Sequence, residues 1–304
     1  MDCPTQLRLF WEARVFSEDD ELHLADNEPR RRPSYLMRLA ASRNYPWYDS
    51  WWLDQYATAI RTMRDEAPHR VEEFQRAFDV LRTDDGFTVR KLPRVFDDAT
   101  MEAIRHACVG LEPRHLELHE VRNFRRFVVH DHPLFNELHR RITALASEAA
   151  GEALEPSYNF LSLYGHDGVC PLHLDSPRAK YTLDLCVSQS VPWPINFSPP
   201  VQWPTPGLYG PDWEDAIKRE QAGRFTAVSL EPGQSILFSG SSQWHYRDRM
   251  PVASTKAQCD LLFFHFIPRG TKNLVDPLQW ASTFTEPALM GFGRRRNDPE
   301  AADQ

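Results

Sequence analysis

The second half of the chain is a succession of short stretches typical of strands, separated by turns that contain glycine or proline. The stretches expected to be strands are 157–164, 170–175, 180–187, 194–197, 226–230, 235–239, 243–248 and 257–267. Many short strands joined by such turns are typical of a β-barrel or a β-sandwich. We therefore expect a mainly β core with flanking helices, and a double-stranded β-helix (a jelly roll, cupin-like) fits the number of strands.

The first 86 residues indicate a helical extension instead. Ser50 is suited to cap a helix over 51–66, and Pro68 is suited to end it, because serine is a preferred N-cap and proline breaks a helix. A second helix is expected over 69–81, where phenylalanines recur on one helical face.

Helices and strands alternate between this extension and the strand-rich half. We expect a strand over 87–92 and one or two strands over 115–130. Helices are expected over 98–110 and 133–150, because their apolar residues are spaced three and four apart.

Two histidines and one aspartate have the spacing of a metal site. His173 and Asp175 are two residues apart, and positions i and i+2 of a strand point to the same face. His245 stands 72 residues after His173 and would supply a third ligand from a distant strand. Two imidazoles and one carboxylate on one face of an octahedral ion leave positions open, which is the usual arrangement of non-haem iron(II) sites. Because no cysteine belongs to the set, iron(II) is favoured over zinc.

An HxD pair alone occurs by chance in many proteins, so the residues around it decide whether it indicates a metal site. Residues 164–175 are similar to the segment that delivers this pair in prolyl-4-hydroxylase-like, 2-oxoglutarate-dependent oxygenases. Residues 230–238 resemble that family's Pro-Gly turn into an apolar strand, and 241–245 its approach to the distal histidine. Residues 250–266 resemble its final loop and strand. The resemblance covers about residues 87–268 and includes neither the first 86 residues nor the tail.

The resemblance implies that His173, Asp175 and His245 are the catalytic, iron(II)-binding residues, with 2-oxoglutarate as co-substrate and dioxygen as oxidant. That family places a lysine or arginine about ten residues after the distal histidine, where it holds the far carboxylate of 2-oxoglutarate. Lys256, eleven residues after His245, matches this position, and Tyr164 is the matching hydrogen-bond donor.

The chain departs from that family at Arg247 and Arg249, where the family more often has small residues. Both arginines point to the same face as His245 if the strand continues. A guanidinium holds a carboxylate through two hydrogen bonds, so these arginines are alternatives to Lys256, or they bind a substrate carboxylate. Because Asp175 keeps its carboxylate, we expect hydroxylation or desaturation rather than halogenation.

Several other polar residues have an ordinary structural interpretation, which we prefer. His130 and His132 are expected to serve a turn and a helix start, with a second metal pair as the alternative, and His265 to be a core histidine. Residues 188–225, rich in proline and tryptophan, are either a lid or a packed surface loop. A solvated strand face, or else recognition of an anionic substrate group, is expected for Arg122, Arg125 and Arg126.

Composition limits the partners and the compartment. The net charge of −8 argues against binding a nucleic acid or an anionic membrane. No apolar run approaches the ~20 residues that a membrane span needs, and no secretory signal is visible in the first ten residues. Five scattered cysteines without a CxxC pair indicate reduced thiols in a cytoplasmic protein.

We therefore expect an oxygenase domain over 87–269, preceded by the extension over 1–86 and followed by a C-terminal segment, 270–304, that ends in a flexible tail from about residue 288. The expected reaction is hydroxylation of an unactivated C–H bond in a small molecule, such as an amino acid or a biosynthetic intermediate. The alternatives are a peptidyl hydroxylase of the prolyl type and a non-catalytic jelly-roll protein that binds a metal or ligand.

Overall fold

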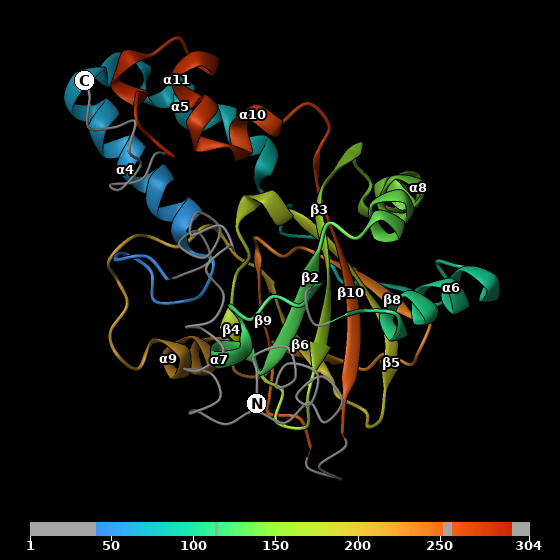
Figure 1. Ribbon diagram of the computed structural model, residues 1–304. Coiled ribbons are helices and arrows are strands. Elements are labelled where there is room, and N and C mark those ends of the chain that lie inside the picture. The colour runs from blue at the N-terminus through green and yellow to red at the C-terminus, as the bar shows by residue number, and fades with distance from the viewer. Residues whose placement is uncertain (1–40, 113–114, 252–256, 294–304) are drawn as a thin grey trace, which may run out of the picture.

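Two antiparallel sheets form the core of the computed structural model, which describes residues 41–112, 115–251 and 257–293 (Figure 1). The six-stranded sheet has the order β1-β8-β5-β10-β3-β2, and the four-stranded sheet has the order β4-β9-β6-β7. The strands are β1 (Arg90–Leu92), β2 (Arg126–His130), β3 (Leu154–Tyr164), β4 (Cys170–His173), β5 (Tyr181–Gln189), β6 (Ile195–Pro200), β7 (Thr226–Val228), β8 (Ser235–Phe238), β9 (Gln243–Arg247) and β10 (Cys259–Pro268).

Strands β3 to β10 are wound as a double-stranded β-helix. The hairpin β6–β7 lies at the middle of the winding, and its two arms pair antiparallel as β5 with β8, β4 with β9 and β3 with β10. Each arm passes from one sheet to the other, so the chain folds back along itself. The expected jelly roll is therefore confirmed, and all eight expected strands are present, with ends that differ by a few residues.

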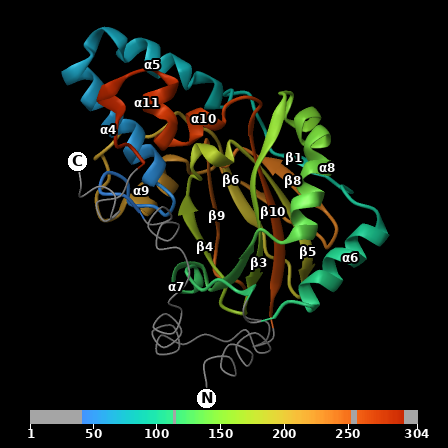
Figure 2. The ribbon, with the colours of Figure 1, turned by 45° about the horizontal axis from the view of Figure 1, so that its top comes forward.

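Strand β10 lies in the interior of the larger sheet, and its side chains point alternately to two buried faces. Every residue of β10 is buried. Leu262 and Phe264 face one apolar cluster beneath α6 (Asp98–Val109) and α8 (Pro133–Ala150), while Phe263 faces the interior between the sheets. Figure 2 shows α6 and α8 on the same side of the larger sheet. A strand buried on both faces needs the nearly continuous apolar run that this segment has.

A helical layer at one end of the sheets joins the two ends of the described chain (Figure 2). It contains α4 (Trp51–Glu66), α5 (Val71–Ala77), α10 (Lys272–Val275) and α11 (Trp280–Thr283). The rings of Trp52 and Trp280 meet edge to face with centroids 5.6 Å apart. Leu172 and Leu174, at the end of β4, belong to the same cluster, so the layer is fixed to the sheets.

Three local expectations were wrong. Ser50 does not cap α4 with its side chain, because its hydroxyl donates to the Tyr45 carbonyl oxygen and accepts from the Ser42 N–H. The stretch 115–130 contains a helical turn, α7 (Val121–Phe124), which ends at Arg125 in the left-handed region (φ 57°). A free tail from residue 288 is contradicted by Leu289, which is 1% exposed.

The loop over 188–225 is a packed excursion rather than a lid. It contains β6 and α9 (Trp213–Glu220), and its aromatic side chains pack against the segment before α4. Trp47 contacts Tyr209 edge to face at 5.2 Å and Trp213 at 5.9 Å. No helix among the described residues is long and apolar enough to cross a membrane.

Candidate metal centre and its cavity

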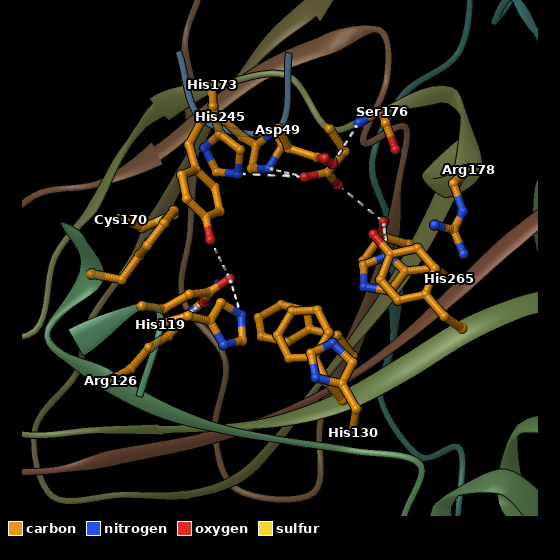
Figure 3. A pocket seen from close by; sticks show the side chains of 18 of the residues that line it. Asp49, His119, Arg126, His130, Cys170, His173, Ser176, Arg178, His245 and His265 are labelled. Carbon is orange, nitrogen blue, oxygen red and sulfur yellow. Dashed lines mark hydrogen bonds and ion pairs between the residues drawn. The ribbon is translucent and has the colours of Figure 1, made fainter. Parts of the chain in front are cut away.

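A cavity of about 630 Å³ lies between the two sheets and the first residues of the helical layer. Strands β3, β4, β5, β9 and β10 all contribute side chains to its wall, and Tyr48, Asp49, Trp51 and Trp52 close it from the N-terminal side. Figure 3 shows His173 and His245 on one side of this cavity and His119, His130 and Arg126 across from them. A cavity of this size, lined by both charged and aromatic side chains, is suited to a small polar ligand.

His173, Asp175 and His245 converge on one point of the cavity wall. His173 and His245 are direct partners on the antiparallel strands β4 and β9, and their ring centroids are 4.2 Å apart. Asp175 Oδ1 lies 3.4 Å from His173 Nε2 and 3.7 Å from His245 Nε2. Among the described residues, these three form the one group of at least three such side chains that could hold a metal ion.

Asp175 reaches this point by a route that differs from the expected one. Strand β4 ends at His173, so Asp175 does not share a strand face with it. Instead the Asp175 N–H donates to the carbonyl oxygen of Gly240 (2.9 Å), which fixes the segment after β4 against the turn between β8 and β9. The carboxylate then lies beside Thr182, whose hydroxyl is 3.4 Å from Oδ2.

Main-chain hydrogen bonds orient both imidazoles in the same way. Nδ1 of His173 lies 2.8 Å from the carbonyl oxygen of Pro171, and Nδ1 of His245 lies 2.9 Å from that of Gln243. A carbonyl oxygen accepts only, so each Nδ1 carries a proton and each Nε2 is turned toward Asp175. With Nδ1 fixed in this way, Nε2 is the ring atom of each histidine that would bind a divalent ion.

The pKa values of the three donors are shifted in different directions. Burial alone would raise the pKa of Asp175, but the two histidines outweigh it and lower the pKa below the ordinary value. Burial lowers the pKa of His245 to about 4. At neutral pH the site therefore offers a charged carboxylate beside the neutral His245 imidazole. At His173, burial lowers the pKa, but Cys170 and Asp175 outweigh it and raise the pKa well above its ordinary value.

Two buried guanidiniums, those of Arg126 and Arg247, lie near Tyr164. Arg126 forms an ion pair with Glu120 and donates from Nη1 to the Tyr164 hydroxyl (2.6 Å). Arg247 is 3% exposed, and its Nη2 lies 2.9 Å from Asp184 Oδ2. Burial opposes the charge on Arg247, but Asp184 raises its pKa, so the guanidinium remains charged. Tyr164, Arg126 and Arg247 all line the cavity.

The other residues expected to bind 2-oxoglutarate are placed differently. Arg249 does not line the cavity, because its side chain is 60% exposed and donates to the carbonyl oxygen of Asp167. Lys256 lies outside the residues that the structure describes.

Several cavity residues were missed or assigned a structural role by the sequence. His265 lines the cavity instead of serving only the core, and His130 lies 3.2 Å from Glu117 across the cavity from the metal donors. Arg126, one of the three arginines expected on a solvated face, is fully enclosed. The sequence gave little indication of two further cavity residues. Arg178 is three residues after Asp175, and Asp49 comes just before α4.

Comparisons with known proteins give partial structural matches only. No family model matches the chain, and no curated protein does. The chain is similar to HygX from Streptomyces hygroscopicus with nickel and 2-oxoglutarate bound (15% identity, 65% of this chain and 87% of HygX, TM-score 0.45). It is also similar to AviO1 from Streptomyces viridochromogenes (15%, 64% and 95%, 0.44) and to iron-bound EctD from S. alaskensis (15%, 59% and 72%, 0.43).

Proposed function

We propose that this chain is an iron(II)- and 2-oxoglutarate-dependent oxygenase that hydroxylates a C–H bond of a small molecule. The observation that carries the proposal is the convergence of His173 Nε2, His245 Nε2 and Asp175 Oδ1 on the wall of a cavity that also holds buried guanidiniums. A mixed set of two nitrogen donors and one oxygen donor on one face of an ion suits iron(II) with open coordination positions.

The residues fit an iron(II) ion on structural grounds. Both Nδ1 atoms are held by carbonyl oxygens, so both rings turn Nε2 toward the place where the ion would bind. Gly240 leaves space at the Asp175 carboxylate that any side chain would fill. The donor set contains no thiolate, although the buried Cys170 is near, so it does not resemble a structural zinc site.

The far carboxylate of 2-oxoglutarate is proposed to bind between Arg247 and Tyr164. Arg247 follows His245 by two residues on β9, so its side chain enters the same cavity farther along the strand. A buried guanidinium beside a phenol hydroxyl provides the cation and the donor that a dicarboxylate needs. Arg126, which donates to that hydroxyl, supports it from the other side.

Bound iron(II) with 2-oxoglutarate supplies the oxidation of a substrate C–H bond by dioxygen, giving the alcohol, succinate and carbon dioxide. The chain's own residues bind and orient. His173, His245 and Asp175 would hold the ion at the cavity wall, and Arg247 would anchor the co-substrate. Phe124 and Phe238 line the cavity near the histidines and exclude bulk water there.

The test is co-substrate turnover. Anaerobically purified protein is loaded with iron(II) and 2-oxoglutarate, oxygen is admitted, and succinate is measured with and without a panel of amino acids and biosynthetic intermediates. Succinate that rises with a panel member supports the proposal and identifies the substrate class. A chain that binds iron tightly but forms no succinate, even slowly without substrate, is a non-catalytic metal-binding protein instead.

A further inference from the structure

Three arginines line the described part of the cavity, and two of them form ion pairs with a carboxylate. Among the described lining residues, Arg126 is paired with Glu120 and Arg247 with Asp184. Arg178 also lines the cavity but forms no ion pair or hydrogen bond with a described residue. A guanidinium at the edge of an enclosed site attracts an anionic group, because the low dielectric of the surroundings strengthens the interaction.

Arg178 is held beside the metal donors by the segment that carries Asp175. It is the middle residue of the short 3₁₀ turn Pro177–Ala179, and the residues before and after it are buried. Its guanidinium carbon lies 5.4 Å from the centroid of the Tyr158 ring. Figure 3 shows Arg178 at the rim of the cavity, near Ser176 and His265. The half-buried side chain is therefore braced on an aromatic surface, and its donors remain available.

A second polar atom at the same place has no partner. His265 stacks on Tyr158 with ring centroids 4.1 Å apart, and its Nδ1 lies 2.9 Å from the Thr182 hydroxyl. Its Nε2 is buried and makes no hydrogen bond with any described residue. Buried polar atoms are nearly always paired, so an orphaned nitrogen on a cavity wall indicates a ligand that completes it.

This end of the cavity is separate from the proposed 2-oxoglutarate end. Tyr158 and Tyr164 both lie on β3 and both line the cavity, six residues apart. At about 3.3 Å per residue they are roughly 20 Å apart. Arg178 lies at the Tyr158 end, whereas Arg126 and Arg247 lie at the Tyr164 end. One dicarboxylate is too short to occupy both ends.

We infer that the substrate is an anionic small molecule whose carboxylate or phosphate binds Arg178, with His265 Nε2 hydrogen-bonded to a polar group of the same molecule. This inference rests on the proposed oxygenase function and names its substrate class. The Thr182 hydroxyl lies within hydrogen-bond distance of both Asp175 Oδ2 and His265 Nδ1. A molecule bound by Arg178 and His265 therefore lies beside the proposed metal site.

Calorimetric binding of probe anions tests the site without turnover. The full chain is loaded with nickel(II) and saturating 2-oxoglutarate, and benzoate, phenyl phosphate and the neutral benzamide are titrated. We expect benzoate or phenyl phosphate to bind at least tenfold more tightly than benzamide, and the better probe distinguishes a carboxylate site from a phosphate site. Arg178→Gln should abolish the preference and Arg178→Lys should keep part of it. The exposed Arg219, paired with Asp212, provides the matched control Arg219→Gln.

Equal affinity for benzamide and both anions, or an unchanged preference in Arg178→Gln, overturns the anion site.

For His265, the three hydroxybenzoates are compared with benzoate. If one hydroxybenzoate binds more tightly than benzoate, and this difference is lost in His265→Phe, the hydrogen bond to His265 is supported. If none of the three isomers binds more tightly than benzoate, the hydrogen bond is overturned. Succinate formation separates the two proposals: anion preference without succinate removes the oxygenase function alone, and succinate without anion preference removes the anion site alone. The affinity for 2-oxoglutarate should be unchanged in Arg178→Gln.

Discussion

The main chain of Gly240 lies directly against the carboxylate of Asp175. A Cβ atom at Gly240 would overlap Asp175 Oδ2 and stand 2.8 Å from the carbonyl oxygen of Ala179. The Gly240 carbonyl oxygen also accepts the Asp175 N–H at 2.9 Å. The turn between β8 and β9 thus sets both the main chain and the side chain of the one carboxylate in the metal site.

Gly240→Ala should therefore push the Asp175 carboxylate out of line with the two imidazoles. We expect the affinity for iron(II) or cobalt(II) to fall by about 10–100-fold, the size of effect seen when groups that orient a metal ligand are disturbed. Metal titration of the folded variant measures this. Gly210→Ala, in an exposed loop, should leave the affinity unchanged, and an unaltered affinity in Gly240→Ala would contradict the role of the contact.

His245→Ala should remove one of three metal donors and stop turnover. The expected result is loss of bound iron(II) together with loss of succinate formation, because a site left with two protein donors holds the ion weakly. Iron content and succinate are measured on the same sample. His106 is exposed on α6, and His106→Ala is the control that should behave as wild type. Full activity in His245→Ala would exclude it from the ligand set.

Replacing Arg247 should separate stability from co-substrate binding. Arg247→Leu leaves Asp184, which is 0% exposed, without its partner, and breaking such a buried pair costs about 3–5 kcal/mol of unfolding free energy. Arg247→Leu combined with Asp184→Leu should recover most of that loss. Both variants should need at least tenfold more 2-oxoglutarate for half-maximal succinate formation. A normal requirement in the stable double variant would assign the co-substrate to another cation.

Acid should destabilise the fold partly through His139. Burial lowers the pKa of His139 from 6.5 to about 4, so the unfolded chain binds a proton more readily than the native chain. The stability that neutral His139 contributes is present above pH 6.5 and is lost as the pH falls toward 4, at about 1.4 kcal/mol per pH unit. Urea unfolding at several pH values should show a smaller slope between pH 6.5 and 4 for His139→Gln than for wild type. Parallel slopes would refute this assignment.

Trp280→Ala should weaken the helical layer. Trp280 is 0% exposed, stacks edge to face on Trp52 and donates from Nε1 to the Leu274 carbonyl oxygen at 2.8 Å. Truncating a buried tryptophan of this kind costs about 3–5 kcal/mol. Leu278→Ala, at a residue 45% exposed in the same segment, should change the free energy of unfolding by less than about 0.5 kcal/mol.

The strands were accessible to sequence analysis because their signal is local. Alternating segments and the turn residues between them mark most strands, and β10 is marked by an apolar run that is buried over its whole length. The turn α7 escaped notice because Val121 and Phe124 are apolar residues among other apolar residues, and only their burial against different neighbours distinguishes a helical turn from a strand. Ser50 failed as a cap because the fold of the preceding segment engages its hydroxyl.

The convergence of the three proposed metal donors was predictable for a different reason. His173 and Asp175 are close in sequence, and the resemblance supplied His245. The role of Gly240 depends on a contact between segments that are distant in the chain, and the orphaned Nε2 of His265 exists only because Thr182 occupies the other nitrogen. Whether an arginine such as Arg178 is paired cannot be seen before the chain is folded.

The pairing of Trp52 with Trp280 has a consequence for synthesis. One ring lies near the beginning of α4, which closes the cavity, and the other becomes available only when residue 280 has left the ribosome. A nascent chain that stops before residue 280 offers the Trp52 ring only its contacts with Tyr56, Phe78 and Trp203. The wall that Trp51 and Trp52 form over the proposed metal site should therefore reach its full stability only after residue 280 has left the ribosome.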